Sequence, residues 1–287
     1  MRRTIAERHS TPAGERPATV VQRLDAAARR RVTAGGMVWR EWGAGRALVL
    51  LHGAHGSWTH WIRNVTALAT RFRVLAPDMP GFGDSGPAPE PHTAEGLAAV
   101  VSAGMDEVVT PAEERDLAGF SFGGIVAGLV AARPDARVGA LALLGPNGMA
   151  LPREPLPALR RPRTAMTPGE VAQVHRDNLA ALMIADAARV DDLAVHVQRD
   201  NVRRARFRVG DIPDSDVLLR ALPAVRARLV GVWGDRDPYA APHLDARRTA
   251  LARFAPDLDF RVIEGAGHWA IYEAADRVNA ALLDALA

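Results

Sequence analysis

The segment Gly119-Phe120-Ser121-Phe122-Gly123 has the composition of a turn that carries a nucleophile. It matches G-x-S-x-G, directly after an apolar stretch and directly before a helical pattern. A serine in such a turn has a strained backbone, and side chains two residues before and after it would collide with neighbouring backbone, so glycine is needed at both places. The following helix points its first N–H groups at the turn, which favours developing negative charge. The sequence therefore predicts Ser121 as a nucleophile.

Two segments nearer the C-terminus supply an acid and a base. Asp235 and Asp237 lie in Gly234-Asp235-Arg236-Asp237-Pro238, and His268 lies in Gly265-Ala266-Gly267-His268-Trp269. An imidazole can accept the proton of a serine hydroxyl, and a carboxylate can fix the imidazole tautomer. His268 is the predicted base, and the residue types alone allow either aspartate to orient it.

Two other patterns raise the question of a cofactor. His52 and His55 follow an apolar stretch, but no third metal ligand accompanies them at a suggestive spacing, so we predict a hydrogen-bonding His52 and no metal. The glycines of Gly81–Gly86 spell G-x-G-x-x-G, the pattern of a dinucleotide site. Such a site must open a helix, whereas prolines follow directly here. The sequence therefore predicts no cofactor.

The composition excludes several classes of protein. The 287 residues contain no cysteine, and all 36 basic residues are arginine, so thiol, disulfide, Schiff-base and P-loop chemistry are absent. The arginines are spread along the chain, which argues against a nucleic-acid surface. No apolar run is long enough for a membrane helix, and Met1-Arg2-Arg3 is not followed by the apolar region of a secretory signal. We predict a cytoplasmic protein with a small-molecule substrate, and the sequence leaves open whether it forms a homo-oligomer.

Short apolar runs alternate with helical patterns from residue 37 onward, which predicts a mostly parallel sheet with helices on both faces. The predicted strands are Met37–Trp42, Ala47–Leu51, Arg73–Ala76, Asp116–Gly119, Ala140–Leu144, Arg228–Trp233 and Phe260–Ile263. The predicted helices lie near residues 60–70, 94–109, 122–132, 241–254 and 270–286. This alternation indicates an α/β core at residues 31–146 and 223–287.

Two parts of the chain fall outside this alternation. Residues 147–222 open with a proline-dense passage and continue as two helical patterns, the first of which begins with a capping signal at Thr167 and Glu170. A helical insertion between two parallel strands is expected to cover the carboxyl ends of the strands, where such sheets bind ligands, so we predict a cap. Residues 1–30 are predicted to be a mobile leader with a short helix outside the main body.

The chain from about residue 35 onward resembles α/β hydrolases that carry a lid, a group including esterases, haloperoxidase-like enzymes and meta-cleavage-product hydrolases. Besides the segments above, Ala76–Gly86 resembles their APDxPGxGxS loop. The resemblance implies the α/β-hydrolase fold and the order Ser, Asp, His. Its G-x-x-D spacing selects Asp237, and it implies an oxyanion hole formed by the backbone N–H groups of Ala54 and Phe122. A serine at position 121 sets the chain apart from the related haloalkane dehalogenases and epoxide hydrolases.

Some features resemble the meta-cleavage-product hydrolases in particular. The turn Leu144–Gly148 is similar to their LMGPGG turn, Trp269 follows the histidine as in those enzymes, and Arg199 lies where their cap carries a substrate-binding arginine. The chain departs from them at Phe120, where they commonly have asparagine, and in the turn after His52. From the resemblance and from the turn that begins at His52, we predict four substrate-binding residues, which are Arg199, Trp269, Phe120 and His52. Apolar side chains expected around an acyl pocket are Trp58, Trp61, Phe122, Met149 and Trp269.

Together these features predict a serine hydrolase acting on a small carbonyl substrate. The resemblance leaves open two bonds, a carboxylic ester or lactone and a carbon–carbon bond of the meta-cleavage-product type, and a haloperoxidase-like enzyme is a related alternative. A third hypothesis is a ligand receptor that keeps the fold without catalysis. The filled Ser121, Asp237 and His268 positions argue against that receptor.

Overall fold

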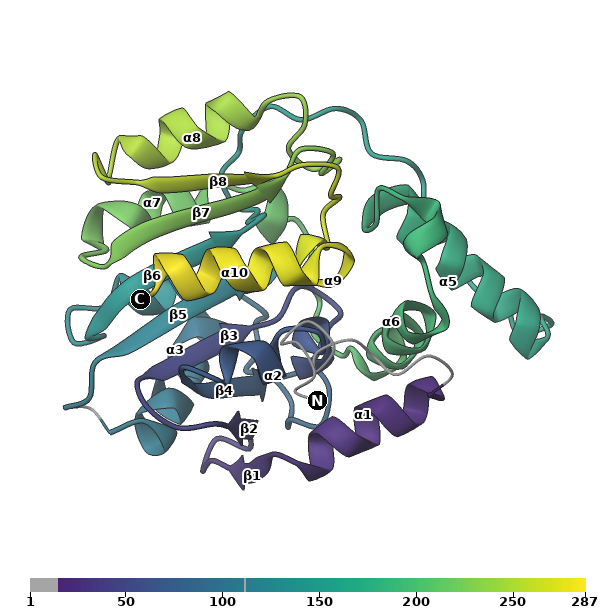
Figure 1. Cartoon of the computed structure of the whole chain (residues 1–287), viewed down its shortest axis with the longest axis horizontal. Helices are drawn as coiled ribbons and strands as arrows, with labels where there is room; N and C mark the ends of the chain where they lie inside the picture. The colour runs from purple at the N-terminus through teal and green to yellow at the C-terminus, as the bar shows by residue number, and fades with distance from the viewer. Residues whose placement is uncertain (1–14, 111) are drawn as a thin grey trace, which may run out of the picture.

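A computed structural model describes residues 15–110 and 112–287. In this part of the chain an 8-stranded sheet has the order β1-β2-β4-β3-β5-β6-β7-β8 (Figure 1). Strands β3 to β8 are parallel, whereas β2 and β1 are antiparallel at one edge. The strands are β1 (Arg29–Val32), β2 (Val38–Trp42), β3 (Ala47–Leu51), β4 (Arg73–Asp78), β5 (Arg115–Phe120), β6 (Val138–Leu144), β7 (Arg228–Gly234) and β8 (Asp259–Ile263). The predicted mostly parallel sheet is confirmed.

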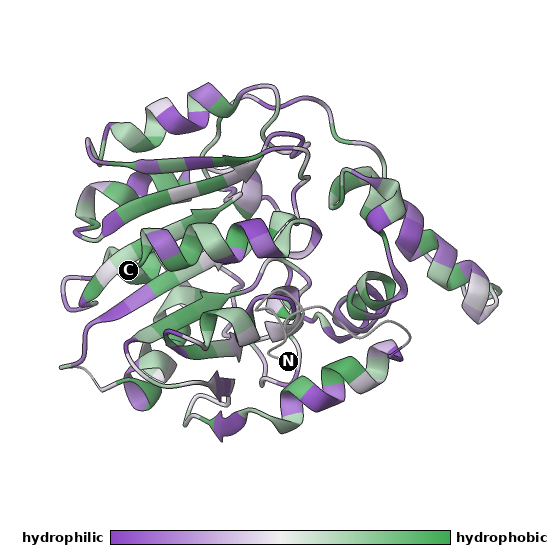
Figure 2. Cartoon of the chain, in the orientation of Figure 1, coloured by the Kyte–Doolittle hydropathy of each residue, from purple (hydrophilic) through white to green (hydrophobic). Residues whose placement is uncertain are grey.

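Both faces of the sheet are covered, as the unbroken apolar runs of its central strands predict. In β3, Leu48 and Leu50 join the core cluster on one face, while Ala47, Val49 and Leu51 join the cluster on the other. Figure 2 shows hydrophobic residues concentrated in the central strands, with hydrophilic residues recurring along α5 and α6. The period of two along each strand thus divides the core into two layers.

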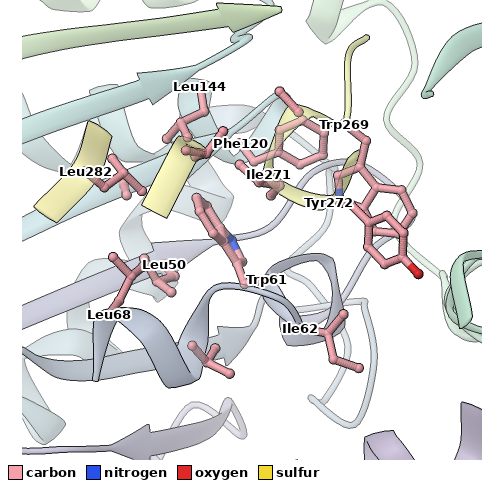
Figure 3. Close-up of a cluster of buried hydrophobic side chains, with 14 of the residues drawn as sticks. Leu50, Trp61, Ile62, Leu68, Phe120, Leu144, Trp269, Ile271, Tyr272 and Leu282 are labelled. Atoms are coloured by element: carbon pink, nitrogen blue, oxygen red, sulfur yellow. The ribbon is translucent and has the colours of Figure 1, made fainter. Parts of the chain in front are cut away.

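The helices that surround the sheet pack against these two layers. They are α1 (Pro17–Ala26), α2 (Val65–Leu68), α3 (Ala94–Val108), α4 (Phe122–Ala131), α5 (Pro168–Leu182), α6 (Asp192–Arg204), α7 (Val217–Ala221), α8 (Leu244–Ala252), α9 (Ala270–Glu273) and α10 (Ala275–Ala285). Helices α2 and α10 contribute Leu68 and Leu282 to the first cluster, which also holds Trp61 and Trp269 (Figure 3). Helices α3, α4, α7 and α8 cover the other face.

The N-terminal region differs from the prediction of a mobile leader. Residues 17–26 form α1, whose Val20 and Leu24 are buried in the first core cluster. The indole Nε1–H of Trp42 donates to the carbonyl of Leu24 at 3.0 Å, and Asp25 forms an ion pair with the buried Arg40. α1 is therefore attached to the sheet edge, and β1, which was not predicted, follows it. Residues 1–14 of the predicted leader lie outside the described residues.

Between β6 and β7 the described chain has α5, α6 and α7 and no strand. α5 begins as predicted: the Thr167 hydroxyl accepts from the Glu170 N–H, and the Glu170 carboxylate accepts from the Thr167 N–H, which together form a capping box. Figure 1 shows α5 and α6 standing off the end of the sheet toward which β7 and β8 point. These helices thus face the carboxyl ends of the strands.

Several element boundaries differ from those predicted. The region near residues 60–70 is a 3₁₀ turn at Trp58–Trp61 followed by the short α2, and the region near 270–286 is divided into α9 and α10. No helix opens directly after Gly86, because the next helix in the described chain, α3, begins at Ala94. The glycine-rich loop therefore lacks the helix that a dinucleotide site requires. In the described parts of the chain, no helix is both long and apolar enough to cross a bilayer.

Candidate active site

Ser121 lies in a sharp turn between β5 and α4. Its φ of 52° and ψ of −119° put a non-glycine residue in a strained conformation, and its N–H donates to the carbonyl of Leu144 at 2.9 Å. A Cβ on Gly119 would lie 2.4 Å from the carbonyl oxygen of Gly123, and a Cβ on Gly123 would lie 2.4 Å from that of Leu51. Only glycine fits at both positions, as the G-x-S-x-G pattern predicts, so the turn holds Ser121 in one place.

His268 connects Ser121 to a carboxylate. The imidazole Nε2 is 2.9 Å from the Ser121 Oγ, and Nδ1 is 2.9 Å from Oδ2 of Asp237. The second carboxylate oxygen of Asp237 accepts from the N–H of Tyr239 at 2.8 Å. All three linked side chains are nearly buried, with 7%, 4% and 1% of Ser121, His268 and Asp237 exposed. The hydrogen bonds thus form a continuous chain from carboxylate to hydroxyl.

Asp235, the other candidate carboxylate, does not contact His268. Its buried Oδ1 has no hydrogen-bond partner within the described residues. Both aspartates follow β7, but the turn after Gly234 brings only Asp237 to the imidazole. The spacing implied by the resemblance therefore selects the aspartate that the structure places beside His268.

The loop that carries His268 is fixed by Glu273 in α9. The Glu273 carboxylate accepts from the N–H groups of Gly267 at 2.7 Å, Ala185 at 3.0 Å and Asp186 at 2.9 Å. Its Oε2 bonds Gly267 and Ala185, while Oε1 bonds Asp186. One buried carboxylate thus joins the His268 loop to the chain that follows α5.

Two backbone N–H groups near Ser121 are free to bind an anionic oxygen. Phe122 is the first residue of α4, so its N–H has no partner within the helix. Ala54 follows β3 and lines the cavity described below. Neither N–H donates a hydrogen bond within residues 15–110 and 112–287. These are the two donors that the resemblance assigns to an oxyanion hole.

Two buried histidines hold the turn that carries Ala54. His52 Nε2 accepts from the N–H of Met79 at 2.9 Å, so its proton is on Nδ1, which donates to the Gly53 carbonyl at 2.8 Å. The N–H of Gly53 in turn donates to Nδ1 of His60 at 3.2 Å. Burial lowers the pKa of His52, and it lowers the pKa of His60 well below its ordinary value. Both rings are therefore neutral.

A cavity of about 700 Å³ lies over Ser121 and His268. Part of its wall is apolar and comes from β5, from residues 146–167 and from the end of α5; this part includes Phe120, Met149, Leu151, Leu156, Leu182 and Met183. Polar side chains on the wall include His60, Arg153, Gln198 and Tyr239. Ser121 thus faces a space large enough for a small organic molecule.

Near the Asp237 turn the cavity wall contains a buried arginine, Arg247. Its guanidinium donates to the carbonyls of Pro152 at 2.5 Å, Tyr239 at 2.9 Å and His243 at 3.1 Å. Burial lowers the pKa of Arg247, and the charge of Asp237 opposes that shift. The arginine thereby ties the proline-dense passage to the loop after Asp237.

The match to known families covers most of the chain. Residues 48–281 match the model described as the alpha/beta hydrolase family. The chain belongs to the α/β hydrolase family. The glycine-bounded serine turn and the Ser121–His268–Asp237 hydrogen bonds lie within the matched residues.

This α/β hydrolase is similar to proteins with different names. It is 31% identical, over 85% of its length, to the dihydrolipoyllysine-residue acetyltransferase component of the acetoin cleaving system of Pseudomonas putida, and it spans 65% of that protein. It is 30% identical to the 2-hydroxy-6-oxo-6-phenylhexa-2,4-dienoate hydrolase of Burkholderia cepacia, with 85% of this chain and 89% of that protein covered. Among solved structures, the naproxen esterase of Bacillus subtilis has a TM-score of 0.72 at 20% identity, covering 97% and 99% of the two chains.

Contrary to the prediction, Arg199 does not line the cavity of this α/β hydrolase. Arg199 is exposed on α6, and the neighbouring residue Gln198 lines the cavity instead. Successive helix residues point about 100° apart, so a one-residue difference decides which side chain faces the substrate space. The predicted substrate contact of Arg199 therefore has no support in the arrangement of α6.

The other predicted substrate-binding residues divide into two groups. Phe120 lines the cavity, with its ring centroid 5.1 Å from that of His268. Trp269 is fully buried and donates through Nε1 to the His60 carbonyl at 3.1 Å. Both ring nitrogens of His52 form hydrogen bonds with backbone groups. These two residues therefore support the site without lining the cavity. Of the side chains expected around an apolar pocket, Met149 lines the cavity, whereas Trp58, Trp61, Phe122 and Trp269 belong to the core.

Three residues important to the site were not identified from the sequence. His60 accepts a hydrogen bond from the Gly53 turn, and Glu273 holds the His268 loop. The ring of Tyr239 packs on that of His268 at a centroid distance of 4.4 Å. Tyr239 stands two residues after Asp237 and Glu273 five residues after His268, so their proximity to the motifs was a usable signal. His60 stands alone in its segment, and no motif marks it.

Proposed function

We propose that this α/β hydrolase is a serine hydrolase that cleaves a small carbonyl compound through an acyl-enzyme. The observation that carries the proposal is the unbroken hydrogen-bond chain from Asp237 through His268 to Ser121, at 2.9 Å for each bond to the imidazole. Nucleophile and base are within the distance at which a proton can transfer between them. Residues 147–222, which contribute α5 and α6 to the cavity side, are proposed to be its cap.

The arrangement supports a mechanism in two steps. The Ser121 Oγ attacks the substrate carbonyl carbon while His268 Nε2 takes the hydroxyl proton, and the N–H groups of Ala54 and Phe122 bind the oxyanion. His268 then gives that proton to the leaving group, which departs as the bond to the carbonyl carbon breaks. In the second step water attacks the acyl carbon, His268 accepts a proton from the water, and Ser121 leaves with the proton restored. Asp237 stabilises the imidazolium in both steps.

We take the scissile bond to be a carboxylic ester or lactone. Beside Ser121 the cavity wall carries Phe120, whereas Arg199 lies outside the cavity. Arg153 and Arg247 also line the wall, but an aspartate already pairs with the first, and the second donates to backbone carbonyls. The apolar part of the wall suits a neutral acyl chain, whose transfer from water into the pocket is favourable. A second candidate is carbon–carbon hydrolysis, which the likeness to the Burkholderia cepacia dienoate hydrolase favours.

The catalytic proposal is tested with an organophosphate that releases p-nitrophenol when a serine attacks phosphorus. We expect one equivalent of p-nitrophenol per folded protein, with the added mass on the peptide that contains Ser121. S121A should take no label and should lose at least about 10³-fold in kcat on a short p-nitrophenyl ester while keeping its melting temperature. The matched control is S215A in the 147–222 segment, which should react like the wild type. A fully active S121A would overturn the proposal.

The two bonds are distinguished by running a p-nitrophenyl ester and a 2-hydroxy-6-oxo-dienoate in parallel. Loss of the dienoate absorbance measures carbon–carbon cleavage, and release of p-nitrophenol measures ester cleavage. A larger kcat/KM on the ester supports the proposed function. A larger kcat/KM on the dienoate would establish the second candidate instead.

A further inference from the structure

The buried ring of His60 fits against Gly56, which has no side chain. His60 belongs to the 3₁₀ turn at Trp58–Trp61, is 2% exposed, and lines the cavity that contains Ser121. A Cβ on Gly56 would lie 2.4 Å from Cε1 of His60, so only glycine at position 56 leaves room for the ring. The His60 carbonyl also accepts the indole N–H of Trp269, the residue after His268.

The hydrogen bond to Gly53 determines the tautomer of His60. A backbone N–H can only donate, so Nδ1 of His60, which lies 3.2 Å from the Gly53 nitrogen, must be the acceptor. A neutral imidazole with a free Nδ1 carries its proton on Nε2. Within the described chain no group accepts from this Nε2–H. The ring therefore holds the backbone with one nitrogen and leaves the other for the cavity.

Gly53 is held at both of its polar groups. Its carbonyl accepts from His52 Nδ1–H at 2.8 Å and its N–H donates to His60 at 3.2 Å. The peptide that contains the Gly53 carbonyl also contains the N–H of Ala54, because the two groups share one planar unit. Restraining Gly53 from both sides thus restrains the direction in which the Ala54 N–H points.

We propose that His60 is a positioning residue for the oxyanion hole: by accepting the Gly53 N–H, it directs the Ala54 N–H at the oxyanion formed on the substrate. The inference rests on the proposed function as a serine hydrolase and assigns to it a residue that lies outside the triad. Loss of a whole oxyanion donor reduces kcat by about 10²- to 10³-fold. Because removing His60 misdirects this donor without deleting it, we expect a reduction of about 10- to 100-fold.

The test uses three substitutions that separate the two ring nitrogens. In H60N the amide oxygen stands at the level of Nδ1 and can accept from Gly53. In H60Q the amide stands at the level of Nε2 and cannot do so without displacing the turn, and H60A removes both groups. On a p-nitrophenyl ester, H60Q and H60A should lose about 10- to 100-fold in kcat with KM within about threefold, whereas H60N should stay within about threefold of the wild type in kcat.

Binding of a transition-state analogue gives a second readout that a space-filling role would not affect. A trifluoromethyl ketone forms a hemiketal oxyanion with the serine, so its affinity for H60Q and H60A should fall by the same factor as kcat/KM. Active-site titration with the organophosphate counts the folded molecules, so a partly unfolded variant is still measured per competent site. Equal losses in H60N, H60Q and H60A would overturn the inference, as would wild-type kcat in H60A.

The inclusion of S121A separates this inference from the proposed function. An inactive S121A together with normal H60A and H60Q contradicts the role of His60 alone. An S121A that retains turnover contradicts the serine mechanism, and with it the role of His60. An inactive S121A with the graded losses above supports both.

Discussion

The region around Ser121, Asp237 and His268 and the 147–222 segment meet at the same cavity but are held together in different ways. Around Ser121, Asp237 and His268 the side chains are buried, and backbone groups determine their positions. Helices α5 and α6 also bury apolar side chains in the first core cluster, but their outer faces carry exposed ion pairs, such as Asp177 with Arg160 and Arg203 with Asp200. Exposed pairs of this kind contribute little stability. We therefore expect the region around Ser121 to tolerate few residue types at each position, and the outer faces of α5 and α6 to tolerate many.

Glu273 is one of the places where the two regions are coupled. Its carboxylate accepts one N–H from the His268 loop, at Gly267, and two from the end of the α5 region, at Ala185 and Asp186. A Cβ on Gly267 would lie 2.7 Å from the Ala185 nitrogen, so the two backbones are in close contact. The 147–222 segment is thus firmly attached beside His268, where the N–H of Trp269 also donates to the Met183 carbonyl at 2.7 Å.

The largest expected difference is between two neighbouring aspartates of the site region. D237N should reduce kcat by about 10³- to 10⁴-fold, because an amide neither fixes the required tautomer of His268 nor stabilises the imidazolium. D235N, the matched control at the first residue after β7, should stay within about threefold because Asp235 does not contact the ring. Steady-state kinetics on a p-nitrophenyl ester measure both. The reverse ranking would show that the wrong carboxylate is assigned.

Breaking the coupling at Glu273 should have the next largest effect. In E273Q one oxygen remains and an NH₂ group faces backbone N–H donors, so at least one of the three acceptor contacts is lost. We expect a loss of about 2 to 4 kcal/mol in the free energy of unfolding and about a tenfold loss in kcat, since the His268 loop is released. Urea unfolding and ester hydrolysis measure the two effects. The control E264Q changes an exposed residue on the same loop and should alter neither the free energy of unfolding nor kcat. An E273Q variant with wild-type stability and kcat would contradict the coupling.

The contrast between the two regions also explains what the sequence could predict. The sheet was predicted from its short apolar runs, and the Ser121 turn from glycines at positions where no side chain fits. The choice of Asp237 came from the spacing that the resemblance implies, and the structure places this aspartate beside His268. β1 was missed because its sequence, Arg29–Val32, is nearly all arginine and gives no apolar alternation at an exposed edge. Arg199 was misplaced because the rotation of α6 depends on packing of residues far away in the sequence. His60 has no local motif, since its partner Gly53 becomes relevant only once the turn has folded.

Acid should destabilise the protein through its buried histidines. Burial lowers the pKa of His60 well below 6.5, and it lowers that of His196 on α6 to a smaller extent. The unfolded chain protonates histidine at about pH 6.5, so below that pH it binds more protons than the folded chain. The stabilising contribution is thus present above about pH 6.5 and is lost as the pH falls, by up to about 1.4 kcal/mol per pH unit for the fully buried His60 and by less for the partly exposed His196.

Urea unfolding of the wild type between pH 7.5 and 4.5 measures this loss. H60N removes the deeper-shifted group and should flatten the dependence of stability on pH more than H196N does, because His60 is fully buried and His196 is only partly so. The comparison uses the change with pH and not the absolute stability, so any packing defect of H60N cancels. A larger effect of H196N would place the dominant buried histidine in the helical segment.

The smallest expected effects come from the two adjacent residues of α6. Gln198 lines the cavity and has no hydrogen-bond partner within the described chain, whereas Arg199 is exposed. Q198A should therefore raise KM about three- to tenfold for a substrate with a polar group in reach, which corresponds to the loss of one hydrogen bond. R199A should change kcat and KM by less than twofold on both the p-nitrophenyl ester and the dienoate, because a solvated arginine on the outer face of a helix contacts neither. If R199A instead weakens the dienoate more than tenfold and leaves the ester unchanged, α6 must rotate or shift when an acidic substrate binds. The 147–222 segment would then be the adaptable region of the site, with Arg199 turning toward the cavity when an acidic substrate binds.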